Sequence, residues 1–154
     1  MVLMNIGKFD YFKANETEQY LFYQLPVLLI KDDQFKSLSS DAKILYSLML
    51  SRTSLSAKNG WLDEHGNVFI IYTLEEVMEG LNCRDNKATK SLKELREIGL
   101  IKTVRRGLGK PNITYVMNFA TRFKYSPKTE KYPSNHDKSK TRENHDSRIA
   151  KITV

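Results

Sequence analysis

Apolar residues recur at helical spacing in the first half of the chain, behind two clear helix-start signals. The first signal is Ser39-Ser40-Asp41, three residues typical of helix N-termini, and the apolar stripe behind it predicts a helix to about Arg52. The small and polar residues 54–60 are expected to close this helix. The second signal is Thr73 with Glu76 three residues later, a capping-box pattern that predicts a second, shorter helix.

A third helix is predicted over 84–98, after a turn at 81–83. Four apolar residues fall on one of its faces: Ala88, Leu92, Leu95 and Ile98. Gly99 follows at the position where glycine commonly ends a helix.

Three further segments have the pattern of strands and turns. Gly66-Asn67 lies between two apolar runs in 61–72, which predicts a β-hairpin between the first two helices. Two more strands are predicted at 101–106 and 113–119, around a loop with two glycines and a proline at 107–112. This last pair has the form of a wing.

The two ends of the chain differ from this central part. Residues 1–36 combine aromatic and polar positions and predict an extended arm or hairpin, whereas 124–148 has almost no aliphatic residues and predicts a solvated tail. The domain organisation expected is a folded domain at 1–120 and a basic linker or tail at 121–154. Five aromatic residues of the arm are candidates for pairing two protomers or for covering the domain's own core: Phe9, Tyr11, Phe12, Tyr20 and Phe22.

The predicted order is helix, hairpin, helix, turn, helix and two-stranded wing. This order defines an α+β winged helix-turn-helix, here with an N-terminal aromatic arm, and its third helix would enter the major groove of DNA.

The net charge of +7 is unevenly distributed along the sequence. Residues 1–82 carry a net charge of −4, residues 83–112 a net charge of +6 and residues 113–154 a net charge of +5. A protein that docks on phosphates with one face needs such polarity. Positive charge is therefore concentrated on the third helix, the wing and the tail.

Polar and basic residues crowd the N-terminal half of the third helix and the wing loop. Asn pairs with adenine, Lys with guanine or phosphate, and the Thr methyl group contacts thymine. A plain solvated helix face is the alternative for the lysines taken alone, and the basic wing beside them favours DNA. The predicted DNA-binding residues are Arg84, Asn86, Lys87, Thr89, Lys90, Lys93, Arg105, Arg106, Lys110 and Asn112.

Enzymatic and metal-dependent functions find little support in the sequence. Asp63 and Glu64 stand beside a Gly-Asn turn, and the three histidines lack metal-ligand spacing. The loop 107–110 has neither the spacing of a phosphate-binding loop nor a helix after it. We expect no catalysis, no metal and no cofactor. The start of the chain has no basic segment and is followed by charge, so we expect no signal peptide. No stretch approaches the roughly 20 apolar residues of a membrane span, and the single cysteine fits a cytoplasmic protein.

Several sequence blocks together resemble one known family. They include Leu38-Ser39-Ser40-Asp41-Ala42-Lys43, Leu55-Ser56-Ala57-Lys58-Asn59-Gly60-Trp61-Leu62-Asp63, Val68-Phe69-Ile70-Ile71-Tyr72-Thr73 and Gly107-Leu108-Gly109-Lys110-Pro111-Asn112. In this order, over about 5–119, the chain resembles the N-terminal domain of theta-type plasmid replication initiators of Gram-positive bacteria, the RepA N-terminal-domain family.

The resemblance implies a bacterial cytoplasmic protein that binds repeated sites (iterons) in double-stranded plasmid origin DNA, as a homodimer. It further implies that host replication proteins are engaged by a separate C-terminal domain, which is absent from this chain. The alternatives are a winged-helix transcriptional repressor, a DNA nickase, which the lack of paired histidines disfavours, and a module whose wing binds a protein.

Overall fold

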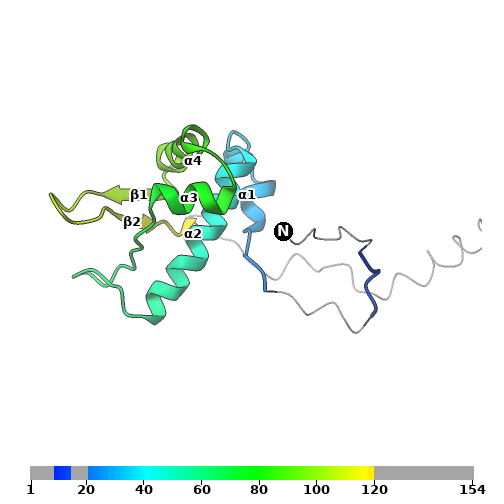
Figure 1. The fold of residues 1–154 in the computed structure, drawn as a ribbon, viewed down its shortest axis with the longest axis horizontal. Coiled ribbons are helices and arrows are strands. Elements are labelled where there is room, and N and C mark those ends of the chain that lie inside the picture. Colours follow the sequence, from blue (N-terminus) through cyan, green and yellow to red (C-terminus); the bar gives the residue numbers. More distant parts are fainter. Residues whose placement is uncertain (1–8, 15–20, 120–154) are drawn as a thin grey trace, which may run out of the picture. The chain divides into compact units, whose positions relative to one another are not determined.

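The computed structural model describes residues 9–14 and 21–119 (Figure 1). It contains the helices α1 (Val27–Lys31), α2 (Ser40–Lys58), α3 (Leu74–Leu81) and α4 (Asp85–Ile98), a 3₁₀ turn η1 (Asp33–Phe35), and the strands β1 (Ile101–Val104) and β2 (Ile113–Val116). None of the helices in these residues is long and apolar enough to span a bilayer.

The helix starts lie where the cap residues predict them. The Ser39 hydroxyl accepts a hydrogen bond from the Ala42 N–H at the start of α2, and Thr73 forms the complete capping box with Glu76 at the start of α3. Asn82 and Gly99 end α3 and α4 in the left-handed backbone conformation. The predicted helix-turn-helix is therefore confirmed.

The predicted end of the first long helix is wrong, because α2 continues to Lys58. Small polar residues remain helical here by bonding to their own helix. The hydroxyl of Thr53 donates to the Met49 carbonyl, and that of Ser54 to the Leu50 carbonyl. A polar composition at 54–60 was thus no signal of a helix end.

The core lies between α2, α3, α4 and the base of the wing. Its completely buried side chains include Leu45 and Met49 of α2, Val77 of α3 and Leu95 of α4. Helix α3 packs closely on α2 at Gly80, because a Cβ atom there would lie 2.8 Å from Cδ1 of Leu48, and that side chain would have to shift. The two helices before the recognition helix thus form a tight platform for it.

The wing is a two-stranded antiparallel sheet, with pairs from Ile101–Val116 to Val104–Ile113. The predicted strands 101–106 and 113–119 are too long. The second strand ends at Val116 because the N–H of Leu100, the next partner in the register, donates to the Leu95 carbonyl at the end of α4. Met117 still donates its N–H to the Leu100 carbonyl, and its own carbonyl accepts the Tyr46 hydroxyl of α2 at 2.8 Å. The first strand ends at Val104, so a longer loop, 105–112, joins the strands.

The predicted hairpin at 61–72 is reduced to one bridge, between Leu62 and Val68. Its reversal is a turn from Asp63 to Gly66, closed by the Gly66 N–H on the Asp63 carbonyl at 3.0 Å. Past the turn the chain leaves its own hairpin, since Ile70 exchanges two hydrogen bonds with Thr114 of β2. Ile70 therefore pairs with β2 of the wing and not with the first half of the predicted hairpin.

Within the predicted arm, 1–36, the described residues 9–14 and 21–26 contain neither helix nor strand. The prediction of an extended arm is wrong for its last part, because α1 and η1 lie there. Tyr20 and the predicted linker or tail at 121–154 lie outside the described residues.

Candidate nucleic-acid interface

Helix α4 has one buried face and one polar, exposed face. Ala88, Ser91 and Leu95 are buried, whereas Leu92 and Ile98 are only half-buried. The Ser91 hydroxyl donates to the Lys87 carbonyl at 2.9 Å, which allows a polar side chain on the inner face. The predicted DNA-binding residues of this helix and of its cap position are all exposed: Arg84, Asn86, Lys87, Thr89, Lys90 and Lys93.

The N-terminus of α4 has no side-chain cap, and one acidic residue, Asp85, stands in its first turn. Arg84 occupies the cap position with an extended backbone and makes no side-chain cap hydrogen bond. The first N–H groups of a helix carry partial positive charge and bind phosphate when no side chain satisfies them. The uncapped N–H groups favour a DNA phosphate at this end of α4, whereas the exposed carboxylate of Asp85 opposes one.

The lysines of α4 differ in their surroundings. The Lys87 ammonium lies 3.1 Å from a carboxylate oxygen of Asp41, at the start of α2. Lys93 is 3.8 Å from Glu97 in an exposed pair within the helix. Within the described part of the chain, Lys90 has neither an ion pair nor a side-chain hydrogen bond. Lys90 is thus the lysine of this face with the least competition for a DNA contact.

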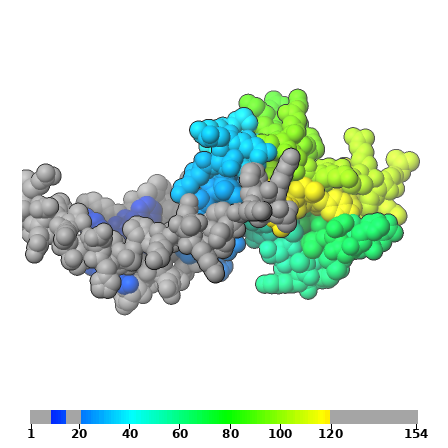
Figure 2. All heavy atoms as spheres, turned by 180° about the vertical axis from the view of Figure 1, so that it is seen from behind, coloured from blue at the N-terminus to red at the C-terminus, as the bar shows by residue number. Residues whose placement is uncertain are grey.

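The wing loop supplies the second group of predicted residues, all exposed: Arg105, Arg106, Lys110 and Asn112. Nε of Arg106 donates to the Pro111 carbonyl at 3.0 Å, which joins the two sides of the loop. Figure 1 shows this loop reaching well beyond the helices, and from behind its yellow-green atoms stand out at the edge of the molecule (Figure 2). The loop is therefore exposed and projects away from the helices.

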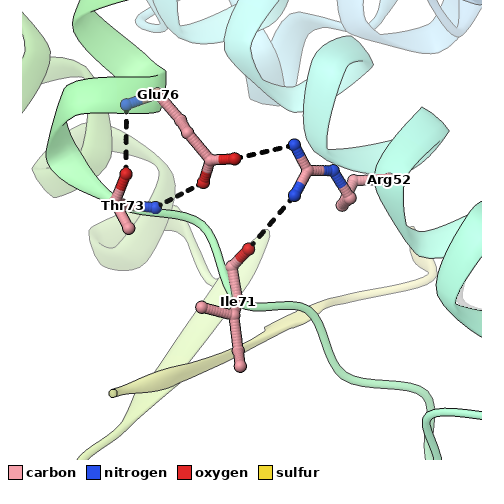
Figure 3. A network of polar contacts seen from close by, with 4 residues as sticks. All are labelled: Arg52, Ile71, Thr73 and Glu76. Carbon is pink, nitrogen blue, oxygen red and sulfur yellow. Dashed lines mark hydrogen bonds and ion pairs between the residues drawn. The ribbon is translucent and has the colours of Figure 1, made fainter.

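Polar contacts hold both helices of the helix-turn-helix on α2. At its start, Glu94 of α4 accepts the backbone N–H of Ser39 at 3.0 Å and its hydroxyl at 2.7 Å. Further along, Arg52 donates to Glu76 of α3 at 2.9 Å and to the Ile71 carbonyl at 3.4 Å (Figure 3). Helix α2 thus fixes the orientation of α3 and α4.

The same network tunes the acid that caps α3. The hydrogen bond from the Thr73 N–H lowers the pKa of Glu76, and the Arg52 guanidinium lowers it further. The guanidinium also lies over the Tyr72 ring, 5.1 Å from its centre. Glu76 therefore stays ionised and holds the cap and the arginine together.

Sequence reasoning missed Arg52, Asp41 and Glu94 as parts of the interface scaffold. Glu94 stands out only as a half-buried acid on a basic helix, and its partner lies 55 positions earlier in the chain. No local spacing rule connects residues so far apart.

Asp63 organises a turn and is not paired with Glu64 as an acid/base couple. Its carboxylate accepts the N–H groups of His65 and Asn67, and the Tyr115 hydroxyl at 2.9 Å. These bonds, led by that of Asn67, lower the pKa of Asp63. The described residues contain no cluster of three His, Cys, Asp or Glu side chains that could hold a metal ion.

The arm aromatics predicted for dimerisation are exposed where the structure describes them. Phe9 and Tyr11 are at least nine-tenths exposed, and Phe12 and Phe22 about two thirds to three quarters. In the part of the chain that the structure describes, none of these four is buried in the core, and pairing of protomers stays a prediction.

The family model of the replication initiator protein A (RepA) N-terminus matches residues 21–129. The chain belongs to this family. A 41 kDa protein of Lactobacillus helveticus is 28% identical over 101 residues, which are 66% of this chain and 29% of that protein. The chain thus spans less than a third of the length of this relative.

Solved structures with the same fold are also similar in sequence. The N-terminal domain of a DNA-binding protein is 37% identical with a TM-score of 0.60, over 78% of this chain and all of that one. A chain from a Rep–DNA complex has the same identity and score, over 77% of this chain and 99% of its own. An MDR initiator is 37% identical with a TM-score of 0.56, over 71% of this chain and 86% of that one. These similarities confirm the winged-helix prediction.

Proposed function

We propose that this chain is the DNA-binding domain of a plasmid replication initiator and binds repeated sites in double-stranded origin DNA. The observation that carries this proposal is the shared exposure of the polar face of α4 and the basic wing loop, on a fold also found in a Rep–DNA complex. Family membership adds the replication role.

In this mechanism α4 enters the major groove, and its N-terminal half reads the bases. Asn86 is placed to pair with adenine, Lys90 with guanine or phosphate, and Thr89 to contact a thymine methyl group. Arg105, Arg106, Lys110 and Asn112 hold the register on the backbone or in the minor groove. Glu94 and Arg52 act indirectly, because they fix the two helices on α2.

A homodimer would place two such surfaces on repeated sites. We propose that the exposed aromatics of the arm, among them Phe9 and Tyr11, pair the protomers. Sedimentation of Tyr11→Ser against the unaltered chain tests this step, since loss of the dimer is expected.

The remaining steps of initiation are proposed to lie elsewhere. The domain acts in the bacterial cytoplasm by binding and catalyses no reaction, while a C-terminal domain of the whole initiator engages host replication proteins. Strand cleavage by the purified chain with Mg²⁺ would contradict the proposal that the domain catalyses no reaction.

A footprint on the cognate origin, repeated at several salt concentrations, tests the central proposal. We expect protection at regularly repeated positions and an affinity that falls steeply with salt. Protection of one isolated operator instead of repeats would indicate the transcriptional repressor, and equal affinity for random DNA would refute specific reading.

A further inference from the structure

The tip of the wing carries a leucine that contributes nothing to the fold. The side chain of Leu108 has a relative exposure of 104%, although it belongs to an aliphatic residue in a folded part of the chain. A polar residue would serve the loop equally well. A single exposed leucine is common on protein surfaces, so the place of Leu108 at the tip of the basic wing loop, and not its exposure alone, points to a contact outside the molecule.

The backbone of the loop presents this residue as a narrow tip. Strand pairing ends at Val104–Ile113, and the chain reverses where the Lys110 N–H approaches the Gly107 carbonyl at 3.4 Å. Gly107 and Gly109 have φ values of 101° and 78°, which disfavour any side chain. Leucine therefore stands at the tip with a glycine on each side.

The two sides of the loop are held together beneath this tip. The Arg106 side chain bridges them through its bond to the Pro111 carbonyl, and proline restricts the returning strand. The tip is thus a braced projection. A side chain that enters the minor groove needs such a projection, because this groove is only about 6 Å wide.

Cations surround the apolar tip. Arg105, Arg106 and Lys110 are exposed in the same loop, and no acidic residue occurs in 105–112. Positive charge on both sides of an apolar point matches a groove in which phosphates flank the base pairs. It does not match an apolar protein surface, which would leave three cations without partners.

We propose that Leu108 inserts from the minor-groove side between two base pairs and kinks the origin DNA where the wing binds. Apolar wedges of this kind partly unstack a base step and bend the duplex toward the major groove. Pyrimidine–purine steps yield most easily, so the residue would favour sites that carry one beneath the wing. This inference rests on the proposed function and adds DNA deformation to it.

The test uses duplexes with one origin repeat and a 2-aminopurine base placed in turn at each step of the protected site. Unstacking raises the fluorescence of 2-aminopurine, and a donor and acceptor on the duplex ends report the bend. At saturating protein we expect a several-fold fluorescence increase at one step and a shorter end-to-end distance. Leu108→Ala should abolish both while the footprint remains.

Three variants separate the wedge from other effects. Leu108→Met keeps an apolar side chain and should retain the fluorescence increase and the bend. Lys110→Ala should weaken binding but retain both signals at saturation. Ile30→Ala shortens another exposed aliphatic side chain, on α1, and should leave every readout unchanged.

The outcomes distinguish this inference from the proposed function. Absence of origin binding by the unaltered chain would refute the proposed function. Binding with no fluorescence change at any step, or an undiminished signal from Leu108→Ala, would overturn the wedge alone. Loss of protein–protein association by Leu108→Ala, with bending intact, would overturn it in favour of a protein contact.

Discussion

Both carboxylate oxygens of Glu94 accept hydrogen bonds from Ser39, one from its backbone N–H and one from its hydroxyl. The same hydroxyl accepts the Ala42 N–H and so caps α2. One serine therefore starts a helix and anchors another, the helix proposed to read DNA. The orientation of α4 depends on this pair.

Replacement of Glu94 by Ala should destabilise the domain by about 1–3 kcal/mol, because the part-buried Ser39 N–H loses its acceptor. Urea unfolding measures this change. Affinity for origin DNA should fall as well, although removal of a negative charge alone would raise it. Tighter binding by Glu94→Ala would show that Glu94 acts through its charge and not by positioning α4.

Lys90 should contribute more to DNA binding than Lys87. Lys90→Ala should weaken binding and reduce the slope of log affinity against log salt by about 1, the value for one lost phosphate contact. Lys87→Ala should do less, since Lys87 is already paired with Asp41. Fluorescence anisotropy over a salt series measures both slopes.

Two further variants control this comparison. Asp41→Asn removes the partner of Lys87 and should increase the loss caused by Lys87→Ala. Lys36→Ala changes the charge equally at a residue paired with Asp33, outside the proposed interface, and should leave the slope unchanged. Equal slopes for the Lys87 and Lys90 variants would contradict the assignment.

Stability should fall in acid partly through Glu76. Its pKa is lower in the folded protein, chiefly because of the Thr73 N–H and then Arg52. Ionised Glu76 therefore stabilises the folded state fully above its ordinary pKa of 4.5. This stabilisation is lost as the pH falls through the lower pKa that Glu76 has in the folded protein. Urea midpoints between neutral pH and pH 3 should decline less steeply for Glu76→Gln.

Asp63→Asn is the matched comparison for this prediction, because the pKa of Asp63 is also lowered, first by the Asn67 N–H. Each variant should remove part of the acid dependence. An unaltered decline in Glu76→Gln would show that the capping network is not linked to folding.

Asn82 lies between α3 and α4 with a φ of 48°, a left-handed conformation that asparagine and glycine tolerate best. Asn82→Ala should cost about 1 kcal/mol, whereas Asn82→Gly should be neutral within a few tenths. Thermal unfolding of the two variants measures the difference. Equal stability of both would mean that the turn relaxes to another conformation.

The sequence by itself determined the elements whose causes are local. Ser39, Thr73 and Gly99 fixed helix ends through bonds and conformations within a few residues, and the 3.6-residue period separated the faces of α4. These features were enough to predict the order of a winged helix and the exposure of its basic residues. Polar composition misled at 54–58, where the chain stays helical and the Ser54 hydroxyl bonds to the Leu50 carbonyl of α2.

Only the tertiary structure decided which of these residues meet. It paired Lys87 with Asp41, Glu94 with Ser39 and Arg52 with Glu76, and it diverted Ile70 to Thr114 at the base of the wing. Each contact joins segments far apart in the chain, so its geometry follows from helix packing and not from spacing. The residue types that can contact DNA are thus written in the sequence, but packing against α2 decides which of them are free to do so.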